Sequence, residues 1–105
     1  MQTSDRLSKL QAMLQRQPDD PFLLYGIAME HKKLGQTDLA LEYLHRTLVA
    51  DPNYAYAHYQ AGQVRQMAGE ADGAKRAYQA GIEAATRAGD QHARGELETA
   101  LADLD

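Results

Sequence analysis

The chain has 105 residues, a net charge of -4 and no cysteine. This length suits one domain that buries roughly two-thirds of its unfolded surface without metals or cross-links. The missing cysteine excludes disulfides and thiolate chemistry, and the mild acidity without a dense basic run argues against a nucleic-acid partner. We see no signal peptide in the opening sequence MQTSDRLSKLQ and no apolar run that could span a bilayer. A cytoplasmic protein without membrane insertion is expected.

Alanine, leucine, glutamine, glutamate and arginine dominate the sequence, and β-branched residues are scarce. This composition favours helices, and the three prolines fall where helices would start or stop. We therefore predict an all-α chain. Apolar spacing and breaker residues divide it into helices over residues 4–17, 21–34, 37–50, 54–68, 70–88 and 91–104.

Polar residues that can cap helices precede several of these segments. We expect Ser4 or Thr3 to cap the first helix, and Asp20, followed by Pro21, to cap the second. Asn53 is expected to cap the fourth helix and Asp90 the last. The predicted apolar stripes of the first, third and last helices are Leu7, Leu10, Met13 and Leu14; Leu41, Leu44 and Leu48; and Leu97, Ala100, Leu101 and Leu104.

Prolines, glycines, small residues and aromatic residues recur along the chain with a period of about 34 residues. A period shared by prolines, glycines, small residues and aromatic residues is a stronger signal than any single match. The matched pairs are Pro18 and Pro52, Gly35 and Gly69, Ala28 and Gly62, Ala40 and Ala74, Tyr25 and Tyr59, and Phe22 and Tyr56.

This period and these residues resemble the tetratricopeptide repeat (TPR), whose pattern places a small residue where two helices cross closely. The first copy reads Leu24-x2-Ile27-Ala28-x2-His31, then Ala40-x3-Leu44 and Pro52. The second reads His58-x2-Ala61-Gly62-x2-Arg65, then Ala74-x3-Tyr78.

The resemblance implies a right-handed stack of about six antiparallel helices. Thr86 replaces the closing proline of the second copy, so the fifth helix is expected to extend to about Ala88, where Gly89 stops it. His58 departs from the family pattern at a position that is usually apolar. The implied division is an N-terminal helix over residues 1–18, repeats over 21–54 and 55–88, and a capping helix over 89–105.

In this family the first helix of each pair lines a concave surface, and the resemblance places an aromatic and methionine-rich face with a basic rim there. Such side chains suit an adaptable binding face. We therefore predict a non-catalytic module that binds a peptide or protein segment in a groove, with acidic residues favoured near the lysines. The implied groove residues are Phe22, Tyr25, Met29, Lys32, Lys33, Tyr56, Tyr59, Gln63, Gln66 and Met67.

The alternative for this face is that its rings pack on one another or under the terminal helices. Some family members also bind a C-terminal carboxylate through a lysine and asparagine clamp. Tyr25 and Met29 occupy the first-copy clamp positions, and Tyr56 and Gln60 occupy the second, so that ligand is not expected.

Two other functions need a test. Two complete copies are short for a helical repeat, and the terminal helices could complete the stack of a second copy of the chain through Leu97, Leu101 and Leu104. His31 and His58 could approach each other across neighbouring helices, but the sequence contains no metal-binding or nucleophile motif. We predict no enzyme activity, metal or cofactor.

Overall fold

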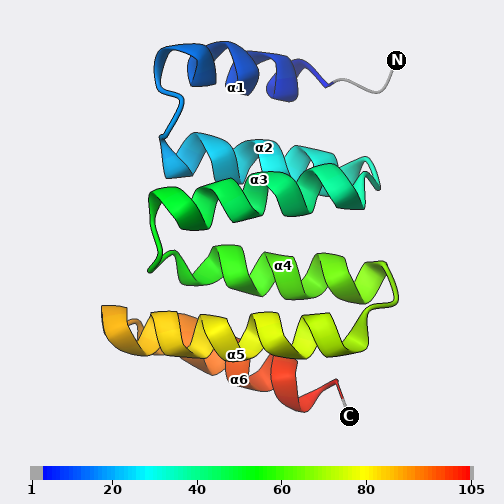
Figure 1. Ribbon diagram of the computed structural model, residues 1–105, viewed down its shortest axis with the longest axis vertical. Helices are drawn as coiled ribbons and strands as arrows, with labels where there is room; N and C mark the ends of the chain where they lie inside the picture. Colours follow the sequence, from blue (N-terminus) through cyan, green and yellow to red (C-terminus); the bar gives the residue numbers. More distant parts are fainter. Residues whose placement is uncertain (1–3, 105) are drawn as a thin grey trace.

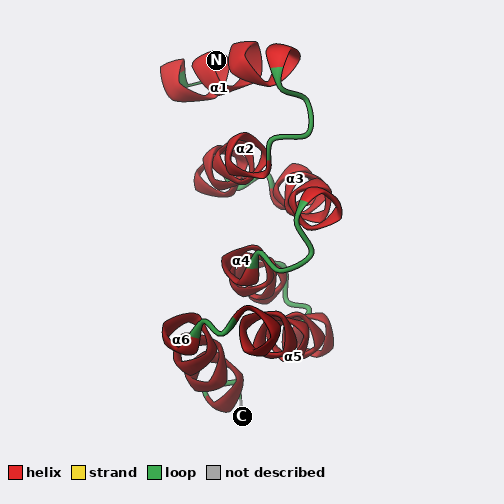
Figure 2. Ribbon diagram, turned by 90° about the vertical axis from the view of Figure 1, so that its left-hand side faces the viewer, coloured by secondary structure: helices red, strands yellow, loops and turns green. Residues whose placement is uncertain are grey.

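The computed structural model describes residues 4–104, which form six helices and no strand. In chain order they are α1 (Asp5–Arg16), α2 (Pro21–Lys33), α3 (Thr37–Ala50), α4 (Ala55–Met67), α5 (Ala71–Ala88) and α6 (Gln91–Ala102). They stack one after another, with α1 at one end of the stack and α6 at the other (Figure 1). Helices α2, α4 and α6 lie on one side and α3 and α5 on the other (Figure 2). The all-α helical-repeat prediction is confirmed.

The predicted period is visible in the helix bounds. Helix α4 begins and ends one repeat period after α2, and α5 begins one repeat period after α3. After α2, α4 and α5 the chain turns through a left-handed glycine, with φ of 73° at Gly35, 77° at Gly69 and 69° at Gly89. The residue after each glycine donates its N–H to a carbonyl five positions back, which closes the helix end. Only glycine adopts this conformation without a steric cost.

Three of the predicted N-caps are confirmed. The Ser4 hydroxyl accepts the N–H of Leu7 at 2.9 Å, and Asp20 Oδ1 accepts that of Phe22 at 2.9 Å. Asp90 Oδ1 accepts the N–H of Ala93 at 3.0 Å. Thr3, the alternative cap of α1, lies outside the described residues. The predicted extension of α5 to Ala88 is also confirmed.

Two local predictions were wrong. Asn53 does not cap α4, because Tyr54 takes the N-cap position and the Asn53 side chain instead accepts from Arg87 Nε at 3.0 Å. Met13 was placed in the apolar stripe of α1 but is 51% exposed. Leu7 and Leu10 already fill the contact of α1 with α2, so the neighbouring side of α1 is left uncovered.

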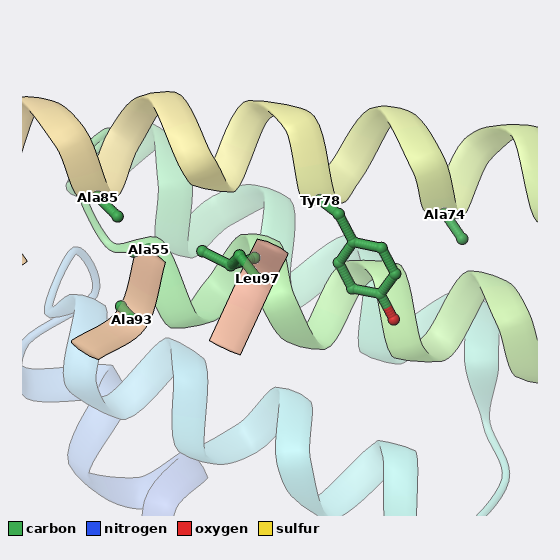
Figure 3. Close-up of a cluster of buried hydrophobic side chains, with 6 residues drawn as sticks. All are labelled: Ala55, Ala74, Tyr78, Ala85, Ala93 and Leu97. Atoms are coloured by element: carbon green, nitrogen blue, oxygen red, sulfur yellow. The ribbon is translucent and has the colours of Figure 1, made fainter. Parts of the chain in front are cut away.

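The core is divided into three successive layers. Leu7 and Leu10 of α1 meet Leu23 and Ile27 of α2 in the first. The second joins α2, α3 and α4 around Leu44. The third joins α4, α5 and α6 and contains Ala55, Ala74, Tyr78, Ala85, Ala93 and Leu97 (Figure 3). Each helix therefore contacts mainly its neighbours in the stack, as expected for a helical repeat.

The tightest crossing lies between α4 and α5. A Cβ placed on Gly62 would lie 2.6 Å from Cδ1 of Tyr78, a separation that no real side chain tolerates. Tyr78 is fully buried and points from α5 toward α4 (Figure 3). Gly62, the small residue predicted at this helix crossing, thus leaves room for Tyr78, the largest fully buried side chain in the described core.

Candidate functional site

A cleft of about 1070 Å³ lies between α4 and α6. Both of these helices lie on the same side of the stack as α2, the first helix of the first pair (Figure 2). Its lining is mixed, with amides, one phenol ring, one imidazole ring, one thioether and two carboxylates. The lining residues are Tyr59, Gln63, Gln66, Met67, Gln91, His92, Gly95, Glu96, Thr99, Ala100 and Asp103. We call it the α4–α6 cleft.

Four of the residues predicted for a groove line this cleft, all from α4. They are Tyr59, Gln63, Gln66 and Met67. Met67 is 54% exposed, although it is a large apolar side chain on the cleft wall. The ring of Tyr59 is half-buried and lies 6.1 Å from that of Tyr78, centroid to centroid. The cleft therefore combines an anchored aromatic floor with an exposed apolar edge.

Tyr56 is predicted for the groove but lies between α4 and α6. Its hydroxyl donates to Glu96 Oε1 at 3.4 Å, and its ring meets Tyr59 edge-on at a centroid distance of 6.4 Å. Burial first, and then the negative charges of Glu96 and Asp90, raise the pKa of this phenol, so it stays protonated and able to donate. Tyr56 thus joins α6 to α4 at one end of the cleft. At this position the ring packs against a neighbouring ring and the terminal helix, which is the alternative given above for the predicted groove face.

The first-pair residues predicted for the groove are separate from the cleft. Tyr25 stacks on Tyr54 with centroids 5.0 Å apart, and Met29 packs against the core layer around Leu44. Lys32 Nζ donates to Gln60 Oε1 at 2.7 Å, and burial lowers the pKa of Lys32.

The remaining two first-pair residues lie at the surface. Lys33 Nζ lies 3.4 Å from Glu30 Oε2, and Glu30 also binds Ser4 and Arg6 of the α1 region. Phe22 is 67% exposed. The residues predicted for one groove therefore lie on two surfaces, the α4–α6 cleft and the surface of the first pair.

The second wall of the cleft comes from α6 and was not predicted. The sequence predicts α6 as a capping helix with an apolar stripe of Leu97, Ala100, Leu101 and Leu104. The opposite face carries a polar stripe at helical spacing, formed by His92, Gly95, Glu96, Thr99 and Asp103. That spacing on a helix with one buried face was the available signal.

The predicted self-association face is wrong in one part. Leu97 is fully buried against α4 and α5, where it fills the space beside Gly81. It is therefore unavailable to a second copy of the chain. Leu101 and Leu104 are half-buried and pack on the same layer.

The two histidines considered for chemistry have different surroundings. His31 is buried, its ring stacks on Tyr43 with centroids 5.5 Å apart, and its Nδ1 lies 2.7 Å from Gln36 Oε1. His58 is half-buried against Gly81 of α5. Burial, and then the charge of Arg87, lower the pKa of His58. Within residues 4–104 no group of three or more His, Cys, Asp or Glu side chains is placed to hold a metal ion.

The stacked helix pairs, with small residues at their crossings and a cleft on the first-helix side, define a helical-repeat protein. The sequence is 32% identical to a TPR repeat-containing protein of Pseudomonas aeruginosa over 96 residues, which cover 91% of each chain. The chain therefore belongs to the TPR repeat proteins. No protein-family model matches the sequence.

Solved structures agree with this assignment. A Bordetella parapertussis protein has a TM-score of 0.83 and 31% identity, covering 97% of this chain and 89% of that one. PcrH of Pseudomonas aeruginosa, solved in complex with the chaperone binding region of PopD, has a TM-score of 0.77 and 21% identity, covering 94% and 78%. At that identity PcrH supports the fold alone. In the described part of the chain, no helix is both long and apolar enough to cross a membrane.

Proposed function

We propose that this chain is a non-catalytic interaction module that binds an extended protein segment in the α4–α6 cleft. The observation that carries the proposal is the cleft itself, with a volume of about 1070 Å³ and a lining that is neither purely apolar nor purely charged. Such a surface offers contact area together with hydrogen-bonding groups that fix orientation. PcrH, which shares this fold, was solved in complex with the chaperone binding region of PopD. A cytoplasmic location stays a prediction.

The cleft can be blocked without disturbing the core at Gly95. This glycine lies on the cleft wall in the middle of α6, and a Cβ added there meets no atom within 4 Å. Gly95→Arg should therefore fold at least as well as the native chain, since glycine is a poor helix former. The long side chain would occupy the cleft. Gln79→Arg is the matched control, because Gln79 is exposed on α5, outside the cleft lining, and receives the same charge.

The test is selection of binders from a displayed library of random peptides on the native chain, followed by affinity measurements on both variants. We expect Gly95→Arg to reduce binding at least tenfold and Gln79→Arg to leave it within about twofold. Peptides that bind Gly95→Arg as tightly as the native chain would place the site elsewhere. A library that yields no binder above an unrelated helical protein would contradict the binding role.

A homo-oligomer would have to form through surfaces that exclude Leu97. The half-buried Leu101 and Leu104 are the remaining part of that predicted face. Sedimentation of the native chain over a wide concentration range tests this, and a monomer at the highest concentration would dismiss it.

A further inference from the structure

The hydroxyl of Tyr78 ends between two glutamine side chains of the cleft. Tyr78 belongs to α5, and its ring passes beneath Gly62 so that its polar tip emerges on the α4 side (Figure 3). There Gln63 Nε2 donates to the hydroxyl at 2.7 Å, and the hydroxyl donates to Gln66 Oε1. Both glutamines line the α4–α6 cleft. One buried phenol therefore orients two amides at the floor of the candidate site.

The hydrogen bonds determine which amide atoms remain free. A phenol has one O–H to donate, and here it accepts from one amide and donates to the other. Gln63 uses one N–H and keeps its carbonyl oxygen, while Gln66 uses its carbonyl and keeps its NH₂ group. Gln63 is half-buried and Gln66 is exposed, so these groups can be reached from the cleft. Burial raises the pKa of Tyr78, and the hydrogen bond from Gln63 offsets part of this rise. Because the pKa is raised, the phenol stays protonated and remains a donor at neutral pH.

The equivalent positions of the first helix pair cannot build this arrangement. One repeat period earlier, Leu44 stands in place of Tyr78, and Met29 and Lys32 stand in place of Gln63 and Gln66. The crossing residue differs in the same sense, because Ala28 stands in place of Gly62. The smaller glycine admits the larger ring. The tyrosine, its space and both amides thus occur together in one pair and are all absent from the other.

We infer that Gln63 and Gln66, held by Tyr78, form a receptor for the backbone of a segment bound in the cleft. The carbonyl of Gln63 would accept one backbone N–H, and the NH₂ of Gln66 would donate to one backbone C=O. In an extended chain the N–H and C=O of one residue point to the same side, as in a hydrogen-bonded strand pair. Recognition of this kind depends on backbone and not on side chains, so the ligand class is an extended peptide of variable sequence. This inference rests on the proposed function.

The first test uses a peptide with almost no side chain. Capped trialanine is titrated to millimolar concentration into ¹⁵N-labelled protein while the side-chain amide signals of the glutamines are followed. We expect the signals of Gln63 and Gln66 to shift. The signal of Gln79, whose side chain is exposed on α5, should not move. Shifts confined to other cleft residues, or no shifts at all, would overturn the backbone receptor. Library peptides that bind and are blocked by Gly95→Arg would still support the proposed function in that case.

The second test removes the free donor without removing the network. In Gln66→Glu the carboxylate still accepts from Tyr78 but has no N–H for a ligand. The control is Gln79→Glu, which adds the same charge at an exposed position of α5 outside the cleft lining. We expect the tightest library peptide to lose roughly tenfold in affinity for Gln66→Glu and to stay within about twofold for Gln79→Glu. Equal losses in the two variants would assign the effect to charge and overturn the inference.

The third test addresses Tyr78 as a positioning residue. Tyr78→Phe keeps the ring under Gly62 and deletes the hydroxyl that orients both amides. We expect the Gln63 and Gln66 amide signals to move to the values of free glutamine, and peptide affinity to fall roughly tenfold. Denaturation identifies any loss of folding, and Gln66→Glu decides the question if this variant is unstable. Amide signals or affinity that do not respond in folded Tyr78→Phe would contradict the positioning role.

Discussion

The helix pairs α2–α3 and α4–α5 have their helix starts and glycine turns in a common repeat register, yet their interiors are filled differently. The first pair combines Ala28 with Leu44 in one core layer. The second combines Gly62 with Tyr78, the ring lying where a side chain on residue 62 would be. In the second pair the residue of the first helix is smaller and the residue of the second helix is larger, while the two helices still cross at the same place. The comparison shows that a position in such a repeat has to be understood together with the residue that faces it.

The comparison predicts its largest effect at Gly62. Gly62→Ala should destabilise the fold by about 3 kcal/mol, because the new methyl group overlaps the buried ring of Tyr78. The double change Gly62→Ala with Tyr78→Leu recreates the pairing of the first helix pair and should recover most of that loss. Urea denaturation of the native chain, both single variants and the double variant gives the interaction free energy. Additive single effects would show that the two positions do not compensate each other.

The helix pattern follows from local signals, and so the sequence predicts it well. The prolines, the left-handed glycines and the caps Ser4, Asp20 and Asp90 act within a few residues of themselves. The missing proline at Thr86 correctly predicts that α5 runs on to Ala88. Asn53 was mispredicted because a residue far along the chain, Arg87, competes for its side chain.

The candidate site depends on contacts that no local signal encodes. Tyr78 meets Gln63 and Gln66 across a helix crossing, and their partnership appears only once the crossing is built. The same is true of α6, whose buried Leu97 turns its polar face toward α4. The repeat period identifies equivalent positions but does not say that α4 borders a cleft with α6, or that Tyr25 of the first pair stacks on Tyr54.

A second difference between the pairs lies at His58, which matches the buried Leu24. Burial and Arg87 lower the pKa of His58 below its ordinary value of 6.5. The unfolded chain therefore takes up the proton first as the pH falls. His58 leaves stability unaffected well above pH 6.5 and reduces it as the pH falls below that value.

His58→Leu should accordingly raise stability by about 1 kcal/mol at neutral pH, through added apolar burial, and by more at about pH 5. Urea denaturation at both pH values measures the two gains. A gain from His58→Leu that is the same at both pH values would contradict the assignment.

A third difference lies in the two side chains that meet at the C-terminal end of α2 and at the C-terminal end of α4. His31 is buried and bonded to Gln36, whereas the equivalent Arg65 and Glu70 form an ion pair near solvent, with Nη1 and Oε1 2.8 Å apart. Gln36→Ala should cost about 1 kcal/mol, because the buried imidazole loses its partner. His31→Leu should remove most of this cost, since no polar ring nitrogen is then left unsatisfied. Denaturation of the two single variants and the double variant measures it, and an unchanged cost in the His31→Leu background would contradict the explanation.

The equivalent change in the second pair is expected to have the smallest effect. Glu70→Ala breaks an ion pair whose side chains are 39% and 52% exposed, so it should cost at most about 0.5 kcal/mol. Added salt should screen this interaction and reduce the difference between Glu70→Ala and the native chain. The cost of Gln36→Ala should change little with salt, because the Gln36 amide carries no net charge and the contact is therefore no ion pair. Denaturation at low and high salt separates the two pairs. A Glu70→Ala cost that equals that of Gln36→Ala and is insensitive to salt would show that both pairs close their helices by the same means.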